Sequence, residues 1–119
     1  MHALMNSCNP AMVQIALKTG IERFREYFDA FGMSGKLGVD LPGEAKGVNF
    51  SDKMTEIDLA VSAFGQRFTV TPLQMLNLAC TIVDDGKLKT PHIVTEILNS
   101  DGTVRKTFDT EVKRQVISD

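Results

Sequence analysis

The side chains whose types and spacing could do chemistry are Ser7 and Asn9, which flank Cys8 just ahead of a predicted helix. A serine hydroxyl can donate and accept at once, and an uncharged amide offers a fixed acceptor and two donors. Enzymes use both groups to move protons or orient polar ligands. The residues also suit a structural role, because Asn9 before Pro10 predicts a helix start whose first free amides the Asn side chain caps. Alone, the tripeptide favours this structural interpretation.

The other candidate groups indicate packing rather than chemistry. Cys8 and Cys80 lie far apart, without Cys-x-x-Cys spacing or a histidine partner, so two half-buried free thiols are expected and a disulfide is the less favoured alternative. His92 has no acidic or thiol neighbour at ligand spacing and is expected at the surface or a strand edge. Glu44 could be an acid, but the turn-forming motif that contains it explains it more simply. No metal and no cofactor is predicted.

Composition places the chain among ordinary globular domains. It has 119 residues, 43% of them hydrophobic, and a formal net charge of −2 from interspersed acids and bases. No basic block could line a phosphate backbone, so nucleic acid is not an expected partner. No apolar run approaches the roughly 20 residues of a membrane helix, and the chain as given is expected to be soluble. Its abrupt ends suggest an internal piece of a longer protein.

Apolar periodicity and helix-terminating residues predict four helices between Asn9 and Gly86. Their expected ranges are 9–20, 21–32, 54–63 and 71–86. Thr71-Pro72 begins the clearest of them. The residues expected to face inward from the second, third and fourth helices are Ile21, Phe24, Phe28 and Phe31; Ile57, Ala60, Val61 and Phe64; and Leu73, Leu76, Ala79, Cys80 and Val83.

The remaining segments predict loops and strands. Residues 32–47 contain too many glycines and prolines for a helix, and their apolar residues predict an ordered loop pinned to the body. Beyond Pro91, alternation in 93–98 and 103–108 around a Ser-Asp-Gly turn predicts a β-hairpin. Residues 111–117 are expected to form a brief helix or turn.

Several short motifs occur together in a fixed order. They are Asn6-Ser7-Cys8-Asn9-Pro10, Leu41-Pro42-Gly43-Glu44, Phe64-Gly65-Gln66, Val70-Thr71-Pro72-Leu73-Gln74 and Asp85-Gly86-Lys87 before Pro91. In this order they resemble the class B penicillin-binding proteins, nearest to division and sporulation transpeptidases of the stage V sporulation protein D type. One departure is Arg67, which stands where many members of the family have glycine.

The resemblance implies an α+β, mainly helical fold. Residues 1–90 would form the helical subdomain of a β-lactamase/transpeptidase-like fold, and residues 91–119 a β-hairpin and the start of the return to the main sheet. The chain would then be a partial transpeptidase domain.

The resemblance also implies roles for the first motif. The family assembles its site from a Ser-x-x-Lys that carries the nucleophile, a Ser-x-Asn and a Lys-Ser/Thr-Gly strand. Ser7 matches the serine that relays a proton, Asn9 matches the asparagine that binds the substrate's amide side, and Cys8 fills the variable middle position. Lys18-Thr19-Gly20 has the letters of the third motif but lies at a predicted helix end, and no serine is followed three residues later by lysine.

By resemblance, the longer protein would be a membrane-anchored peptidoglycan D,D-transpeptidase with its catalytic domain on the extracytoplasmic face. It would cross-link stem peptides through an acyl-enzyme and be acylated by β-lactams, while this chain alone would be inactive. The alternative is a non-catalytic helical interaction or β-lactam-sensor module on the same scaffold. Inward faces that lose their cover would make the isolated chain self-associate, through a shared face or, more favoured, by exchange of the hairpin.

Overall fold

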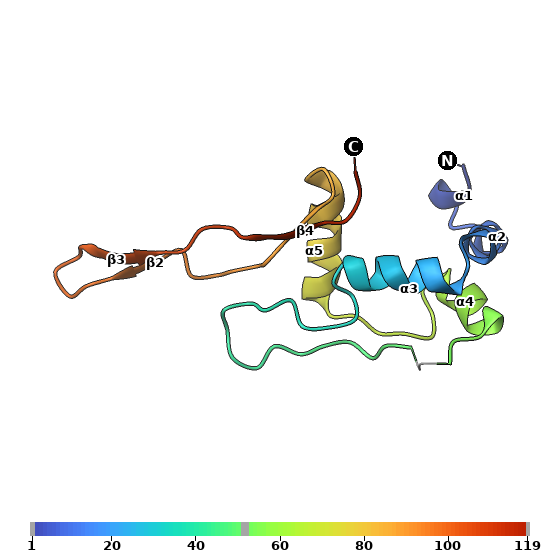
Figure 1. Ribbon diagram of the computed structural model, residues 1–119, viewed down its shortest axis with the longest axis horizontal. Helices are drawn as coiled ribbons and strands as arrows, with labels where there is room; N and C mark the ends of the chain where they lie inside the picture. The colour runs from blue at the N-terminus through green and yellow to red at the C-terminus, as the bar shows by residue number, and fades with distance from the viewer. Residues whose placement is uncertain (1, 51–52, 119) are drawn as a thin grey trace.

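In the computed structural model, residues 2–50 and 53–118 are described, and they form five helices and four short strands. These elements are α1 (His2–Met5), α2 (Asn9–Thr19), α3 (Ile21–Ala30), α4 (Glu56–Ser62), α5 (Pro72–Val83), β1 (Lys87–Lys89), β2 (Glu96–Leu98), β3 (Val104–Thr107) and β4 (Val112–Gln115). The molecule measures 61 × 30 × 23 Å, with α2, α3 and α4 at one end and the β2–β3 hairpin at the other (Figure 1). The predicted α+β, mainly helical fold is confirmed.

The junction between α2 and α3 is set by one glycine. Gly20 has φ +81°, a left-handed conformation that a side chain would strain, and its N–H donates to the carbonyl of Ala16. The chain therefore turns sharply and starts α3 at the next residue. The predicted stripe on α3 is half-buried, and Phe24 and Phe28 lie on it.

The apolar core lies where α2, α3 and α4 meet. Ala16, Met54 and Leu59 are buried together, and Ile21 and Phe24 pack against them. Four aromatic rings continue this core with centroids 4.9–6.2 Å apart, mostly edge to face; they are Phe24, Phe28, Phe50 and Phe68.

Both later helices begin with a reciprocal capping box. The Thr55 hydroxyl accepts from the Asp58 N–H, and the Asp58 carboxylate accepts from the Thr55 N–H. At α5 the pair is Thr71 and Gln74, followed by Pro72 in the first turn. α4 consequently begins two residues later than the predicted Met54. Its buried residues are Leu59 and Ser62, and the prediction that Ile57 faces inward is wrong, because Ile57 is 75% exposed.

The orientation of α5 is the largest departure from the sequence prediction. Its buried residues are Gln74, Asn77 and Thr81, whereas Leu76 and Val83 are 62% and 83% exposed. The prediction that Leu76, Cys80 and Val83 are buried on one face is therefore wrong for this chain. The side of α5 that faces the rest of the chain meets backbone carbonyls, which need donors: Asn77 Nδ2 donates to the Lys89 carbonyl at 3.1 Å.

The glycine-rich segment between α3 and α4 is fixed to α5 through Gln74. Its Nε2 lies 3.3, 3.0 and 2.8 Å from the carbonyl oxygens of Gly32, Met33 and Gly35. The segment has no helix or strand between Phe31 and Thr55 among its described residues, yet Leu37 is almost fully buried. The expectation of an ordered loop pinned to the body is confirmed.

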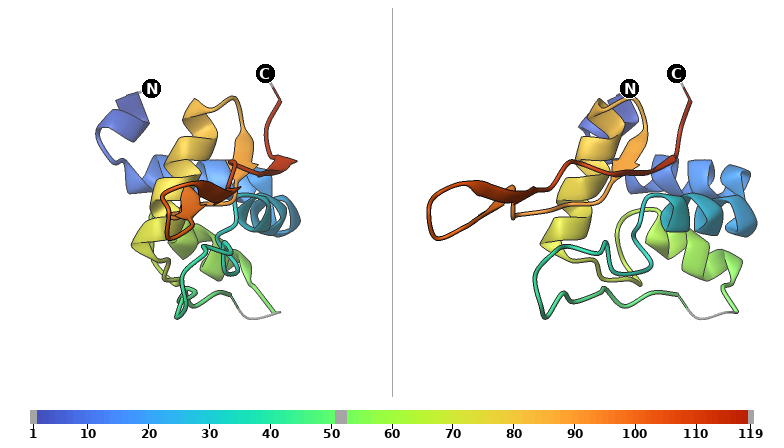
Figure 2. Two further views of the ribbon diagram at one scale, coloured as in Figure 1. Left: turned by 90° about the vertical axis from the view of Figure 1, so that its left-hand side faces the viewer. Right: turned by 60° about the vertical axis from the view of Figure 1, so that its left-hand side comes forward.

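The strands form two separate antiparallel pairs. β2 pairs with β3, which confirms the predicted hairpin. β1 pairs with β4, so the prediction of a brief helix or turn at 111–117 is wrong. Gly86 permits this second pairing: a side chain there would meet the Ile117 carbonyl oxygen at 2.2 Å, so only glycine lets the two segments approach. Figure 2 shows the β2–β3 hairpin projecting from the body beside α5.

Replacing Gln74 by leucine should lower the free energy of unfolding by about 3 kcal/mol or more, because several backbone groups lose their partner in a buried place. Urea denaturation measures this. Gln66→Leu is the matched control at an exposed glutamine, and it should leave stability nearly unchanged. Equal stability of the two variants would contradict the role assigned to Gln74.

Candidate functional site

Ser7 lies at the turn between α1 and α2, in a backbone conformation that normally selects glycine. Its φ is +49°. The Cys8 N–H donates to the Ala3 carbonyl at 2.8 Å, and the Ser7 N–H donates to the Leu4 carbonyl at 3.1 Å. These two bonds form a Schellman motif at the end of α1, with Ser7 in its left-handed position. A serine at such a position stores strain while the two bonds hold its backbone in place.

Asn9 follows as the first residue of α2, and it is not the helix cap. The cap position belongs to Cys8, which makes no side-chain cap bond, while its carbonyl accepts from Ala11 and Met12 at 3.1 Å. The expectation that the Asn9 side chain caps the helix is therefore wrong, although the helix start itself is confirmed. The Schellman turn places the cap at Cys8, one residue earlier, so the Asn9 side-chain amide does not cap the helix.

Both candidate side chains are available to a ligand. Ser7 and Asn9 are exposed, and neither makes a side-chain hydrogen bond to any residue in the described part of the chain. A donor–acceptor hydroxyl in the turn and an amide at the start of α2, two residues apart, are thus both exposed to solvent. Neither residue is a base, so a hydroxyl at this turn needs a proton acceptor from elsewhere to react as a nucleophile.

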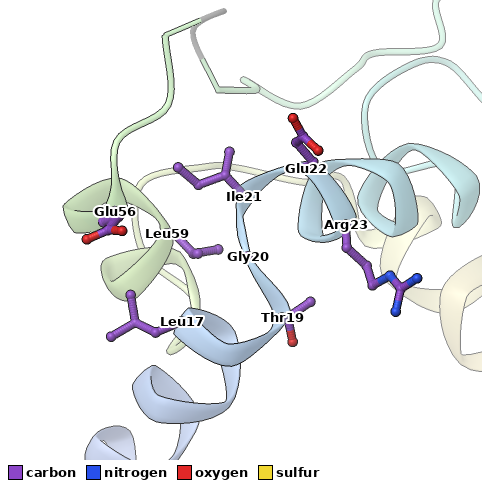
Figure 3. A pocket seen from close by; sticks show the side chains of 8 residues that line it. All are labelled: Leu17, Thr19, Gly20, Ile21, Glu22, Arg23, Glu56 and Leu59. Atoms are coloured by element: carbon purple, nitrogen blue, oxygen red, sulfur yellow. The ribbon is translucent and has the colours of Figure 1, made fainter.

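The Lys18-Thr19-Gly20 triplet ends α2, as predicted. The Thr19 hydroxyl donates to the Ile15 carbonyl at 3.0 Å, and no strand includes these residues. A cavity of about 370 Å³ lies at this turn (Figure 3). Its lining residues are Leu17, Thr19, Gly20, Ile21, Glu22, Arg23, Glu56 and Leu59. None of the predicted site residues lies in it. Among residues 2–50 and 53–118, no cluster of histidine, cysteine, aspartate and glutamate could hold a metal ion.

Glu44 has a structural role, in agreement with the interpretation of its motif. Its two carboxylate oxygens accept from the N–H groups of Leu37 and Gly38 at 2.6 and 2.9 Å. The side chain closes the glycine-rich loop on itself.

Arg67 is a second residue in a conformation suited to glycine, with φ +79°. Its guanidinium pairs with the Asp58 carboxylate at 2.5 Å. Hydrogen bonds from Thr55, and then the Arg67 charge, hold the pKa of Asp58 below its usual value. Arg67 is therefore bound through its side chain to the capping box of α4. The sequence marked Arg67 only as a departure from the glycine that many family members have at this position.

Comparison with known proteins gives a consistent result. The sequence model of one protein family, described as the penicillin-binding protein transpeptidase domain, matches residues 1–119 of this chain. Stage V sporulation protein D of Bacillus subtilis is 35% identical over an alignment that covers 100% of this chain and 19% of that protein. For peptidoglycan D,D-transpeptidase PbpA of Mycolicibacterium smegmatis the identity is 31%, over 98% of this chain and 24% of the relative.

A solved structure agrees in fold as well. Penicillin-binding protein 3 of Mycobacterium tuberculosis, complexed with ampicillin, superposes with a TM-score of 0.80 at 29% identity, over 94% of this chain and 25% of that one. The chain thus spans about a fifth to a quarter of the length of these similar proteins.

Replacing Ser7 by glycine should stabilise the turn by up to about 1 kcal/mol, because the left-handed conformation costs a side chain about 1–2 kcal/mol and the greater freedom of unfolded glycine offsets part of the gain. Slower amide exchange at Cys8 would report it. Ser7→Ala keeps the Cβ and should give no gain. Ser100→Gly, at a residue without positive φ, should give none either. If either control stabilises the turn as much as Ser7→Gly does, then the backbone at Ser7 is not strained.

Proposed function

The chain belongs to the penicillin-binding protein transpeptidase domain family, and we propose that it is the Ser-x-Asn segment of a serine peptidoglycan D,D-transpeptidase. The observation that carries this proposal is the pair formed by Ser7 and Asn9. They stand in the family's motif order, exposed and without side-chain hydrogen bonds to described residues. Glycine would suit this φ better than serine if the residue served only the turn, so a serine here favours a role for the hydroxyl.

In the proposed reaction, a nucleophilic serine outside this chain attacks the carbonyl of a stem peptide and forms an acyl-enzyme. Ser7 would pass a proton between a catalytic lysine, also outside this chain, and the leaving or attacking amine. A hydroxyl suits this step because it donates and accepts in turn. The Asn9 amide would bind the amide side of the substrate and help to hold the lysine. β-Lactams would acylate the same nucleophile, in keeping with the ampicillin complex of the similar M. tuberculosis protein.

The exposed face of α5 supports the view that this segment completes a larger domain. From Pro72 to Val83 the helix carries no charged residue, and its solvent side presents Met75, Leu76, Ile82 and Val83. An apolar surface of this kind is normally covered. In the proposed protein it would pack against the remainder of the transpeptidase domain, which includes the nucleophile.

The proposed protein is anchored in the cell membrane, with its transpeptidase domain on the extracytoplasmic face where peptidoglycan lies. The described residues contain no helix long and apolar enough to span a bilayer.

In the full-length enzyme, Ser7→Ala and Asn9→Ala should each slow acylation by penicillin by about 10²–10⁴-fold, the range expected for loss of a group in proton transfer. Stopped-flow acylation with a fluorescent penicillin measures the rate. Cys8→Ala, at the variable middle position, is the control and should acylate normally. The 119-residue chain alone should form no covalent adduct by mass spectrometry. Unchanged rates in both variants would remove Ser7 and Asn9 from the site.

In isolation the chain should self-associate, because the apolar face of α5 and the edges of the hairpin are uncovered. Light scattering should give a mass above 13.1 kDa that rises with concentration. Leu76→Asp should restore the monomer if α5 forms the contact, and Leu98→Asp if the hairpin does. Since Leu76 is exposed, its replacement should not unfold the chain. A monomer at all concentrations would disprove self-association.

A further inference from the structure

The β2–β3 hairpin is an arm with no packing of its own against the body. Every residue of its two strands is exposed. Neither strand contacts another helix or strand among the described residues, and the arm extends away from α5 at one end of the molecule (Figures 1 and 2). Its direction must therefore be set where it joins the body.

At that junction the backbone ladder is interrupted. On the body side, the Thr90 N–H donates to the Glu111 carbonyl at 2.9 Å, and on the arm side the Phe108 N–H donates to the Thr95 carbonyl at 2.9 Å. Between these bonds Pro91 has no N–H to give. The two strand pairs are thus separate ladders, and the two connections between them are spanned by one side-chain contact, from His92 Nε2 to Thr110 Oγ1 at 3.3 Å. An interrupted backbone ladder of this kind is the local structure of a hinge.

One carboxylate from a distant loop takes the place of the missing ladder bonds. Asp40 Oδ1 accepts from the Ile93 N–H and Asp40 Oδ2 accepts from the Val94 N–H, both at 2.9 Å. Two parallel bonds to one planar group fix orientation as well as distance, and bonds to a charged acceptor are stronger than neutral ones. We propose that Asp40 is a brace that locks the hinge of the β2–β3 arm and sets its direction relative to the helical body.

The brace has a rigid attachment. Glu44 binds the N–H groups of Leu37 and Gly38, and Lys113 of β4 donates to the Leu37 carbonyl. Gln74 holds the earlier part of the same loop to α5. Asp40 therefore projects from a frame that is fixed to both α5 and β4, so a change at its carboxylate changes the arm and not the loop.

Backbone hydrogen bonds at the base of the arm keep the brace ionised. Asp40 lines a hollow of about 170 Å³ with His92 from the connection before β2 and Asp109 and Glu111 from the connection after β3, and Lys113 approaches Gly38 from β4. The hydrogen bonds from Val94 and Ile93, and more weakly the charge of His92, hold the pKa of Asp40 below its usual 3.8. A lowered pKa means that the brace is intact above pH 3.8 and is released as pH falls through the folded-state value. At neutral pH the arm is locked.

Amide exchange followed by NMR tests the brace on the 119-residue chain. Asp40→Asn places an amide donor against one of the two N–H groups, so Ile93 and Val94 should exchange about tenfold faster at neutral pH. Asp109→Asn removes a carboxylate from the same hollow and should leave both amides protected. Asp40→Glu keeps two acceptor oxygens and should restore part of the protection. Unchanged exchange in Asp40→Asn, or equal loss in Asp109→Asn, overturns the proposal.

A distance measurement separates a loosened hinge from loss of structure. Spin labels on Cys80 of α5 and on Ser100→Cys at the arm tip, in a Cys8→Ser background diluted with unlabelled chain, report the arm's direction. Asp40→Asn should broaden the distance distribution while the Asp84 amide, which belongs to the end of α5, stays protected. If the distance distribution of Asp40→Asn is as narrow as that of the chain with Asp40, then Asp40 does not set the direction of the arm. If the distribution broadens and the Asp84 amide also loses protection, then Asp40 has a general structural role instead.

Discussion

The buried side-chain amide of Gln74 holds together parts of the chain that share little apolar contact. It completes the cap of α5 and donates to the carbonyl groups that follow α3, some 40 residues earlier in the chain. Only six apolar side chains are buried among the described residues, too few to fix a glycine-rich loop by packing alone. The hydrogen bonds of the buried Gln74 amide fix the loop instead, since breaking them would leave buried polar groups unpaired.

This arrangement explains why α5 presents its apolar side outward. The side toward the chain's own loops must supply donors to backbone carbonyls, and Gln74 and Asn77 supply them. Thr81 is buried on the same side, where its hydroxyl donates to the Asn77 carbonyl within the helix. The apolar residues then fall on the opposite side, where they face solvent. Helix α5 thus has two inward faces in the proposed enzyme, a polar one toward its own loops and an apolar one toward the rest of the transpeptidase domain.

The candidate site contains one of the few described residues that take a positive φ without being glycine. Seven glycines take the positive φ positions of the described residues, and Ser7, Arg67 and Asp85 are the exceptions. Arg67 has an ion pair that supports it, whereas the Ser7 hydroxyl has no described partner. Ser7 thus combines a strained backbone, held by two hydrogen bonds, with a side chain that is free to act. This combination is typical of residues that serve function rather than stability.

The sequence by itself determined the features that depend on a few neighbouring residues. Gly20 ended α2, Thr71-Pro72 began α5, the Ser-Asp-Gly turn joined β2 to β3, and the order of short motifs indicated the family. These follow from local dihedral preferences and hydrogen bonds within about four residues. The position of Asn9 at the mouth of a helix was predictable, but its freedom from capping was not, because the Schellman turn before it moved the cap to Cys8.

Only the tertiary structure decided which face of α5 is buried, that β1 pairs with β4 across more than twenty residues, and that Asp40 reaches the base of the arm. Periodicity shows that a helix has an apolar side but not what covers it. Each of these features depends on a partner distant in sequence, and in α5 the partner within the chain is a set of backbone carbonyls that leaves no trace in the apolar pattern.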